Sequence, residues 1–112
     1  MQRYGMITGV KPEKADEYKR LHADPWPGVL KKIRECNIRN YSIYFIELDD
    51  GTQYLFSYFE YVGDDFDADM ANMAADPTTQ EWWSVNVPCL IPLPDLEEGQ
   101  VWKSMEEVFH CD

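Results

Sequence analysis

The sequence predicts an α+β fold of the split βαβ plan, in which an antiparallel sheet carries helices on one face. Two observations lead to this prediction. Runs of β-branched and aromatic residues alternate with stretches of helical periodicity, and their order is strand, helices, strand, strand, helices, strand. A chain of 112 residues is long enough to bury a core of its own, so we expect residues 1–112 to form one domain.

The first part of the plan is a strand followed by two helices. "RYGMITGV" (Arg3–Val10) predicts the strand, and Pro12 suits the first turn of the helix after it. Pro25 ends this helix and Pro27 opens the next. The first helix has one stripe formed by Ala15, Tyr18, Leu21 and His22, and the second has an apolar face formed by Val29, Leu30 and Ile33.

A β-hairpin is expected next, because "NYSIYFIEL" (Asn40–Leu48) and "TQYLFSYFEYV" (Thr52–Val62) flank the turn signal "DDG". Both faces of its first strand are apolar or aromatic: Tyr41, Ile43 and Phe45 point one way, and Tyr44, Ile46 and Leu48 the other. One layer of helices covers only one face of the sheet. A second copy of the chain is the simplest cover for the open face, so we expect a homodimer.

The last part of the plan returns to helices and ends in a strand. "GDDFDADMANMAAD" has helical period, with Phe66, Met70, Met73 and Ala74 facing inward. Asp76 and Pro77 are a typical cap and first-turn proline for another helix that carries "EWWSV". Three prolines predict an irregular loop over Pro88–Gly99, and we expect a final strand within Trp102–His110.

Charge and cysteine content exclude several classes of function. Twenty-one acidic and ten basic residues give a net charge of −11, which disfavours nucleic acid and anionic membranes as partners. The three cysteines are far apart and form neither a metal-ligand spacing nor a disulfide framework. No signal peptide or membrane-spanning run is evident, so we expect a reduced, cytoplasmic setting.

Tyr18 and His22 are the first candidates for chemistry. Four residues apart on a helix, they are neighbours on a stripe that faces the protein. An imidazole there can exchange a proton with a ligand near neutral pH. The same spacing also fits a histidine at the edge of the core that only the backbone satisfies.

Trp82 and Trp83 diverge by about 100° on a helix, so only one of them can fill a given core position. The other can present its ring to a pocket, where it would suit the flat C–H face of a sugar; both can also fill a groove between helix and sheet. His110 beside Cys111 is a weak metal signal. Signatures of phosphoryl transfer, serine hydrolysis and zinc catalysis are missing from the sequence.

Together, "EYKRLH", "WP", "NYSIY", "EWW" and the closing "EEVFH" resemble the L-rhamnose mutarotase family over nearly the whole chain. The resemblance implies a ferredoxin-like split βαβ sandwich that forms a dimeric α+β barrel, and a cofactor-independent isomerase that interconverts the α and β anomers of a deoxy-sugar. It places the family's acid/base histidine on His22, its sugar-binding tyrosines on Tyr18 and Tyr41, and its paired tryptophans on Trp82 and Trp83. No metal ligand is implied.

Three segments depart from the family pattern: the hairpin turn "ELDDGTQYLF", the Asp-rich "VGDDFDADM" and "PCLIPLPD" after the tryptophan pair. The resemblance therefore implies the reaction more firmly than the sugar, and L-fucose stands beside L-rhamnose as a candidate. A different class also fits the fold, since small dimeric α+β barrels include non-catalytic sugar-binding modules, monooxygenases and haem-handling proteins.

Overall fold

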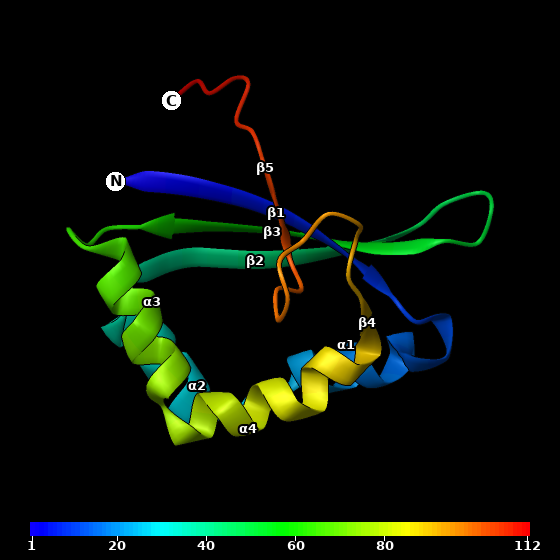
Figure 1. Ribbon diagram of the computed structural model, residues 1–112, viewed down its shortest axis with the longest axis horizontal. Helices are drawn as coiled ribbons and strands as arrows, with labels where there is room; N and C mark the ends of the chain where they lie inside the picture. Colours follow the sequence, from blue (N-terminus) through cyan, green and yellow to red (C-terminus); the bar gives the residue numbers. More distant parts are fainter.

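The computed structural model describes residues 1–112 and has two layers, an antiparallel sheet and four helices that all lie on one side of it (Figure 1). The predicted α+β fold is thus confirmed. The strands are β1 (Gln2–Val10), β2 (Ile38–Glu47), β3 (Gln53–Tyr61), β4 (Leu90–Ile91) and β5 (Lys103–Met105). The helices are α1 (Ala15–Ala23), α2 (Pro27–Glu35), α3 (Phe66–Ala75) and α4 (Pro77–Asn86), with short 3₁₀ turns η1 (Pro12–Lys14) and η2 (Val87–Cys89).

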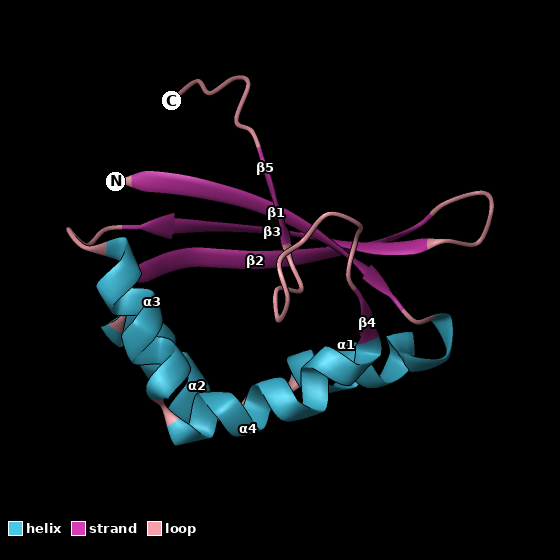
Figure 2. Cartoon of the chain, in the orientation of Figure 1, coloured by secondary structure: helices cyan, strands magenta, loops and turns pink.

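The sheet has the order β2-β3-β1-β4, and β5 pairs with β1 beside β4 (Figure 2). The predicted hairpin is confirmed: β2 and β3 are antiparallel neighbours, and Gly51 takes the positive φ of 86° that their turn requires. Every strand pair is antiparallel. The long strands β1 and β3 lie in the centre of the sheet, and the short strands β4 and β5 both pair with β1.

Proline and aspartate begin the helices where the sequence predicts. Pro27 and Pro77 occupy the first turns of α2 and α4, where a missing N–H costs nothing. The Asp76 side chain accepts a hydrogen bond of 2.9 Å from the Thr79 N–H, and Asp65 caps α3 in the same way.

Two hydrophobic clusters hold the layers together. The first joins α1, η2 and the sheet through Val10, Ala15, Tyr18, Leu55, Cys89 and Leu90. The second joins α2 and α3 to the sheet through Ile38, Phe59 and Tyr61, with Phe66, Met70 and Met73 packed against it as predicted. Leu30 was expected to face inward with Val29 and Ile33, but it is 51% exposed. It instead lines a surface groove between α2 and β2, because this short helix buries only a narrow stripe.

A β-bulge decides which way Tyr41 faces. Between Arg39 and Ser42 the pairing of β2 with β3 shifts, and Asn40 adopts a left-handed conformation with φ of 52°. From that point Tyr41, Ile43 and Phe45 share one face, as predicted, and the packing of Ile43 and Phe45 against the cluster around Tyr18 shows that this is the helix-covered face. The Tyr41 ring contacts Phe59 edge to face at 5.6 Å. The bulge therefore directs this tyrosine to the helix-covered side of the sheet.

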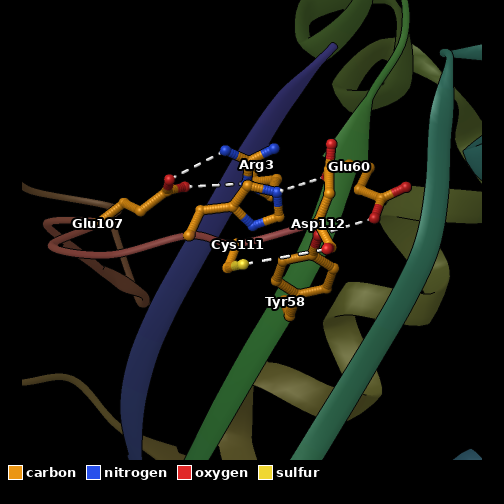
Figure 3. A network of polar contacts seen from close by, with 7 residues as sticks. Arg3, Tyr58, Glu60, Glu107, Cys111 and Asp112 are labelled. Atoms are coloured by element: carbon orange, nitrogen blue, oxygen red, sulfur yellow. Dashed lines mark hydrogen bonds and ion pairs between the residues drawn. The ribbon is translucent and has the colours of Figure 1, made fainter.

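The C-terminal part differs from the prediction in two ways. The expected irregular loop contains the short strand β4, and the expected strand over Trp102–His110 is reduced to β5. The strand pairing ends at Met105, and beyond it the Glu107 carboxylate accepts two hydrogen bonds from the Arg3 side chain, at 3.0 and 3.1 Å (Figure 3). The backbone then ends on the side away from the helices (Figure 1).

The uncovered face of the sheet exposes large apolar side chains, among them Tyr44, Ile46, Phe56, Ile91 and Met105. We call this surface, together with the tail residues Val108 and Phe109, the outer face. Tyr44 is 66% exposed there. Among the helices, none is long and apolar enough to cross a membrane.

Candidate active site

Helix α1 brings Tyr18 and His22 together. Their rings stack with centroids 4.1 Å apart and an interplanar angle of 24°. One turn of helix separates the two residues, so the stacking follows directly from their spacing. Tyr18 is buried against Val10, Leu55 and Cys89, whereas His22 is only partly buried. The pair therefore stands at the boundary between the core and the surface.

The hydrogen bond of His22 determines which tautomer its neutral ring adopts. Nδ1 lies 2.9 Å from the backbone oxygen of Tyr18. Because a carbonyl only accepts, Nδ1 carries the proton that is donated, and in the neutral ring Nε2 has the free lone pair. Burial lowers the pKa of His22, and this bond opposes the shift. The residue thus stays neutral to lower pH than a hydrated histidine, with Nε2 able to accept a proton.

Two tryptophans extend this aromatic row. Trp82, buried on α4, meets the His22 ring edge to face at 5.1 Å, and Trp26 meets Trp82 in the same manner, also at 5.1 Å. Trp26 is the N-cap of α2 and sits between Pro25 and Pro27, which hold the backbone extended before the helix begins. The rings of Tyr18, His22, Trp82 and Trp26 form one continuous cluster, which we call the aromatic row.

The hydroxyl groups of Tyr18 and Tyr41 are close enough to influence each other. Burial raises the pKa of Tyr18, and the nearby Tyr41 and Cys89 raise it further. Burial also raises the pKa of Tyr41, although 43% of the residue is exposed. Both tyrosines remain protonated at neutral pH and can donate hydrogen bonds.

Trp83 does not join the aromatic row. It follows Trp82 on α4, is 37% exposed and contacts no other aromatic ring. The divergence of adjacent tryptophans is thus as predicted, with Trp82 inside. Two surface grooves lie elsewhere: one of about 560 Å³ includes Tyr41, and one of about 360 Å³ lies under the C-terminal tail; neither includes His22.

Several polar atoms of this cluster have no partner within the chain. The His22 Nε2 and the hydroxyls of Tyr18 and Tyr41 form no hydrogen bond to protein atoms. The Tyr18 hydroxyl and His22 Nε2 are not among the buried unpaired atoms of the chain, so solvent reaches them, and open polar atoms beside aromatic rings are typical of a site that binds a polar ligand. No group of three or more His, Cys, Asp or Glu side chains is arranged to hold a metal ion, and all three cysteines are free thiols.

The sheet order β2-β3-β1-β4 with helices on one face defines a small α+β protein of the ferredoxin-like type. Two solved structures have this fold: the L-rhamnose mutarotase FA22100 from Formosa agariphila (TM-score 0.75, 22% identity) and the tetracenomycin F2 cyclase from Streptomyces glaucescens (TM-score 0.68, 16% identity). Each comparison covers 100% of both chains. These likenesses establish the fold and leave the chemistry open.

The sequence comparison identifies the family. The sequence model of L-rhamnose mutarotase matches residues 3–111, so the chain belongs to the L-rhamnose mutarotase family. It is 33% identical to the L-rhamnose mutarotase of Oceanobacillus iheyensis and 30% identical to that of Bacillus subtilis. Both alignments cover 100% of each chain. The family predicted from the short motifs is thereby confirmed.

Sequence reasoning left out two residues of this region. Trp26 was seen only as part of a "WP" motif, although its place between two prolines near a candidate histidine is unusual for a core residue. Asn86 was not considered, although it follows Trp82 by one helical turn and is 5% exposed. The sequence gives one signal for Asn86. It is a polar residue at a position where the helical period predicts an apolar one.

Proposed function

We propose that this chain is a sugar mutarotase that interconverts the α and β anomers of a 6-deoxy-hexose, with L-rhamnose the first candidate and L-fucose the second. Membership in the L-rhamnose mutarotase family supports the reaction. The observation that carries the proposal at the level of residues is the neutral His22, with Nδ1 bonded to a carbonyl and Nε2 free. A proton acceptor of that kind is what ring opening requires.

The proposed reaction moves two protons and breaks one bond. The anomeric hydroxyl loses a proton to His22 Nε2, the C1–O5 bond breaks, and the ring oxygen gains a proton as the C1 carbonyl forms. Rotation about C1–C2 presents the other face of the carbonyl, and the reverse steps close the ring as the other anomer. No electron transfer or covalent intermediate is needed, and we propose that no cofactor takes part.

Protonated tyrosines are suited to the second role in this reaction, which is to act as donor to the ring oxygen. Tyrosine phenols keep their protons at neutral pH, and burial raises the pKa of Tyr18 and of Tyr41 further, so each can act as a hydrogen-bond donor to the ring oxygen. Trp82 would form an apolar wall for the C–H face of the sugar, and Trp83 would contribute only from the outer rim. A positioned acid or base supplies roughly 10²–10⁴-fold in rate. Free sugars already mutarotate in water, so this modest set of groups is sufficient.

Saturation transfer between the two anomeric proton signals tests the proposal. We expect the wild-type protein to accelerate exchange of L-rhamnose, L-fucose or both, and His22→Asn to return the rate towards the spontaneous one. His110→Asn is the matched control, because the second histidine is exposed at the chain end and lines the groove under the C-terminal tail, which does not include His22. Unchanged exchange in His22→Asn would remove His22 from the mechanism. Binding without acceleration would favour a non-catalytic sugar-binding module.

We propose further that two copies of the chain pair through the outer face. Its exposed apolar residues belong to four strands of one sheet, β2, β3, β4 and β5, and to the tail, so a second copy would cover a continuous surface. Sedimentation equilibrium should then give twice the chain mass, and Tyr44→Glu should give the mass of one chain. A wild-type protein that sediments as a single chain would contradict this assembly.

A further inference from the structure

Asn86 carries a buried hydrogen-bond acceptor for which the chain supplies no donor. The residue lies in the last turn of α4 and is 5% exposed. Its Nδ2 donates to the backbone oxygen of Trp82 over 2.8 Å, which settles the orientation of the amide, because a carbonyl can only accept. Its Oδ1 is closed to solvent and has no partner. A buried acceptor in this state is unfavourable, and native folds rarely retain one without a reason.

The location of Asn86 supplies such a reason. One turn before it, Trp82 contacts His22 on α1. Three residues after it, the Cys89 sulfur lies 3.7 Å from a Glu17 carboxylate oxygen, also on α1. Asn86 lies between these two contacts and on the buried face of α4, where the end of this helix approaches α1 (Figure 1). Its neighbours on either side along the chain therefore both reach α1, at His22 and at Glu17.

The neighbouring donor of the chain is already engaged. The Cys89 thiol interacts with Glu17 and, at 3.8 Å, with the backbone oxygen of Val85. Across the interface, the unpaired Tyr18 hydroxyl and His22 Nε2 are held on α1. Helix α4 thus holds an unpaired acceptor one turn from the Trp82–His22 contact, and α1 holds polar groups that no protein atom satisfies, as expected when a ligand with several hydroxyls completes the set.

We propose that Asn86 is a substrate-binding residue whose Oδ1 accepts a hydrogen bond from one hydroxyl of the bound monosaccharide. This inference rests on the proposed function, since the ligand it names is the sugar of that reaction. The role is one of binding and specificity: Asn86 transfers no proton, because an amide neither gains nor loses one near neutral pH. A site built to pair a hydroxyl discriminates strongly against analogues that lack it.

The deciding variant is Asn86→Leu, which has similar size and no acceptor. We expect the Kd for L-rhamnose, measured by calorimetry, to rise about tenfold, as for the loss of one well-formed hydrogen bond. The urea midpoint should stay the same or rise, because the unpaired carbonyl is gone. The matched control is Asn72→Leu, an exposed helical asparagine on α3 that should leave the Kd unchanged. Asn86→Ala serves for the same comparison if the leucine variant does not fold.

A panel of monodeoxy analogues identifies the hydroxyl concerned. One analogue should bind the wild type more weakly than L-rhamnose by about tenfold, yet bind Asn86→Leu no more weakly than L-rhamnose does. A lower urea midpoint with an unchanged Kd would overturn the inference and leave Asn86 a purely structural residue. Wild-type binding without faster anomer exchange would refute the proposed function alone, because the Kd comparison still decides the role of Asn86. Absence of wild-type binding to either sugar would overturn both.

Discussion

Replacing Gly9 with alanine should destabilise the fold through a single close approach. Gly9 is buried on β1 and pairs with Ile91 of β4. A Cβ atom at Gly9 would lie 2.7 Å from the backbone oxygen of Ile91 and 3.3 Å from its Cβ. The first distance is shorter than carbon and oxygen atoms tolerate, and a backbone atom cannot rotate away. Strand β4 would have to move, and with it η2 beside Tyr18.

Gly5 on the same strand provides the matched control. A Cβ there would meet only the Met105 methyl carbon, at 3.5 Å, which is ordinary contact. Both substitutions reduce the freedom of the unfolded chain by a similar amount, about 0.4–1 kcal/mol, so this term cancels between them. What remains is the overpacking at Gly9, about 1–3 kcal/mol.

Urea denaturation at one protein concentration measures this difference. With a slope of about 1–3 kcal/mol/M for a protein of this size, Gly9→Ala should unfold at a urea concentration about 1 M lower than Gly5→Ala. Gly5→Ala should be as stable as the wild type or slightly more so. Equal midpoints for the two variants would refute the reasoning, because they would show that β4 yields without cost.

The remaining predictions concern the protonation of His22. Because burial lowers its folded-state pKa, its imidazole should titrate below 6.5 in NMR spectra recorded on a His110→Gln background, and Trp82→Leu should move the midpoint upward; a midpoint above 6.5 would contradict the burial. As the pH falls, the unfolded chain binds this proton at a higher pH than the folded chain does. The free energy of unfolding of the wild type should therefore decrease as the pH falls below 6.5. His22→Asn should lack that component of the decrease.

Local patterns in the sequence determined most of the secondary structure. The hairpin followed from two β-rich runs around "DDG", and the helix starts followed from Pro27, Asp76 and Pro77, because turns and caps depend on residues within a few positions of one another. The stacking of Tyr18 and His22 was foreseeable for the same reason, since helical spacing alone makes them neighbours.

The length of the last strand depended on contacts that sequence spacing does not contain. The β-rich ending suggested a longer strand, but β1 shares that edge between β4 and β5, and Arg3 binds Glu107 from 104 residues away. Leu30 likewise has the periodicity of a core residue, yet it is exposed because no element packs over it. Periodicity reports which side chains can be buried, and only packing decides which of them are.

The candidate site likewise combines features that the sequence predicted with contacts that only the tertiary structure formed. The sequence by itself determined the family, the pairing of Tyr18 with His22, and the divergence of Trp82 from Trp83. Only the tertiary structure brought α4 against α1, so that Trp82 meets His22 and Asn86 keeps an unpaired acceptor beside them. The physical reason is range: helical neighbours are fixed by backbone geometry within one turn, whereas contacts between helices depend on how the whole chain buries its apolar surface.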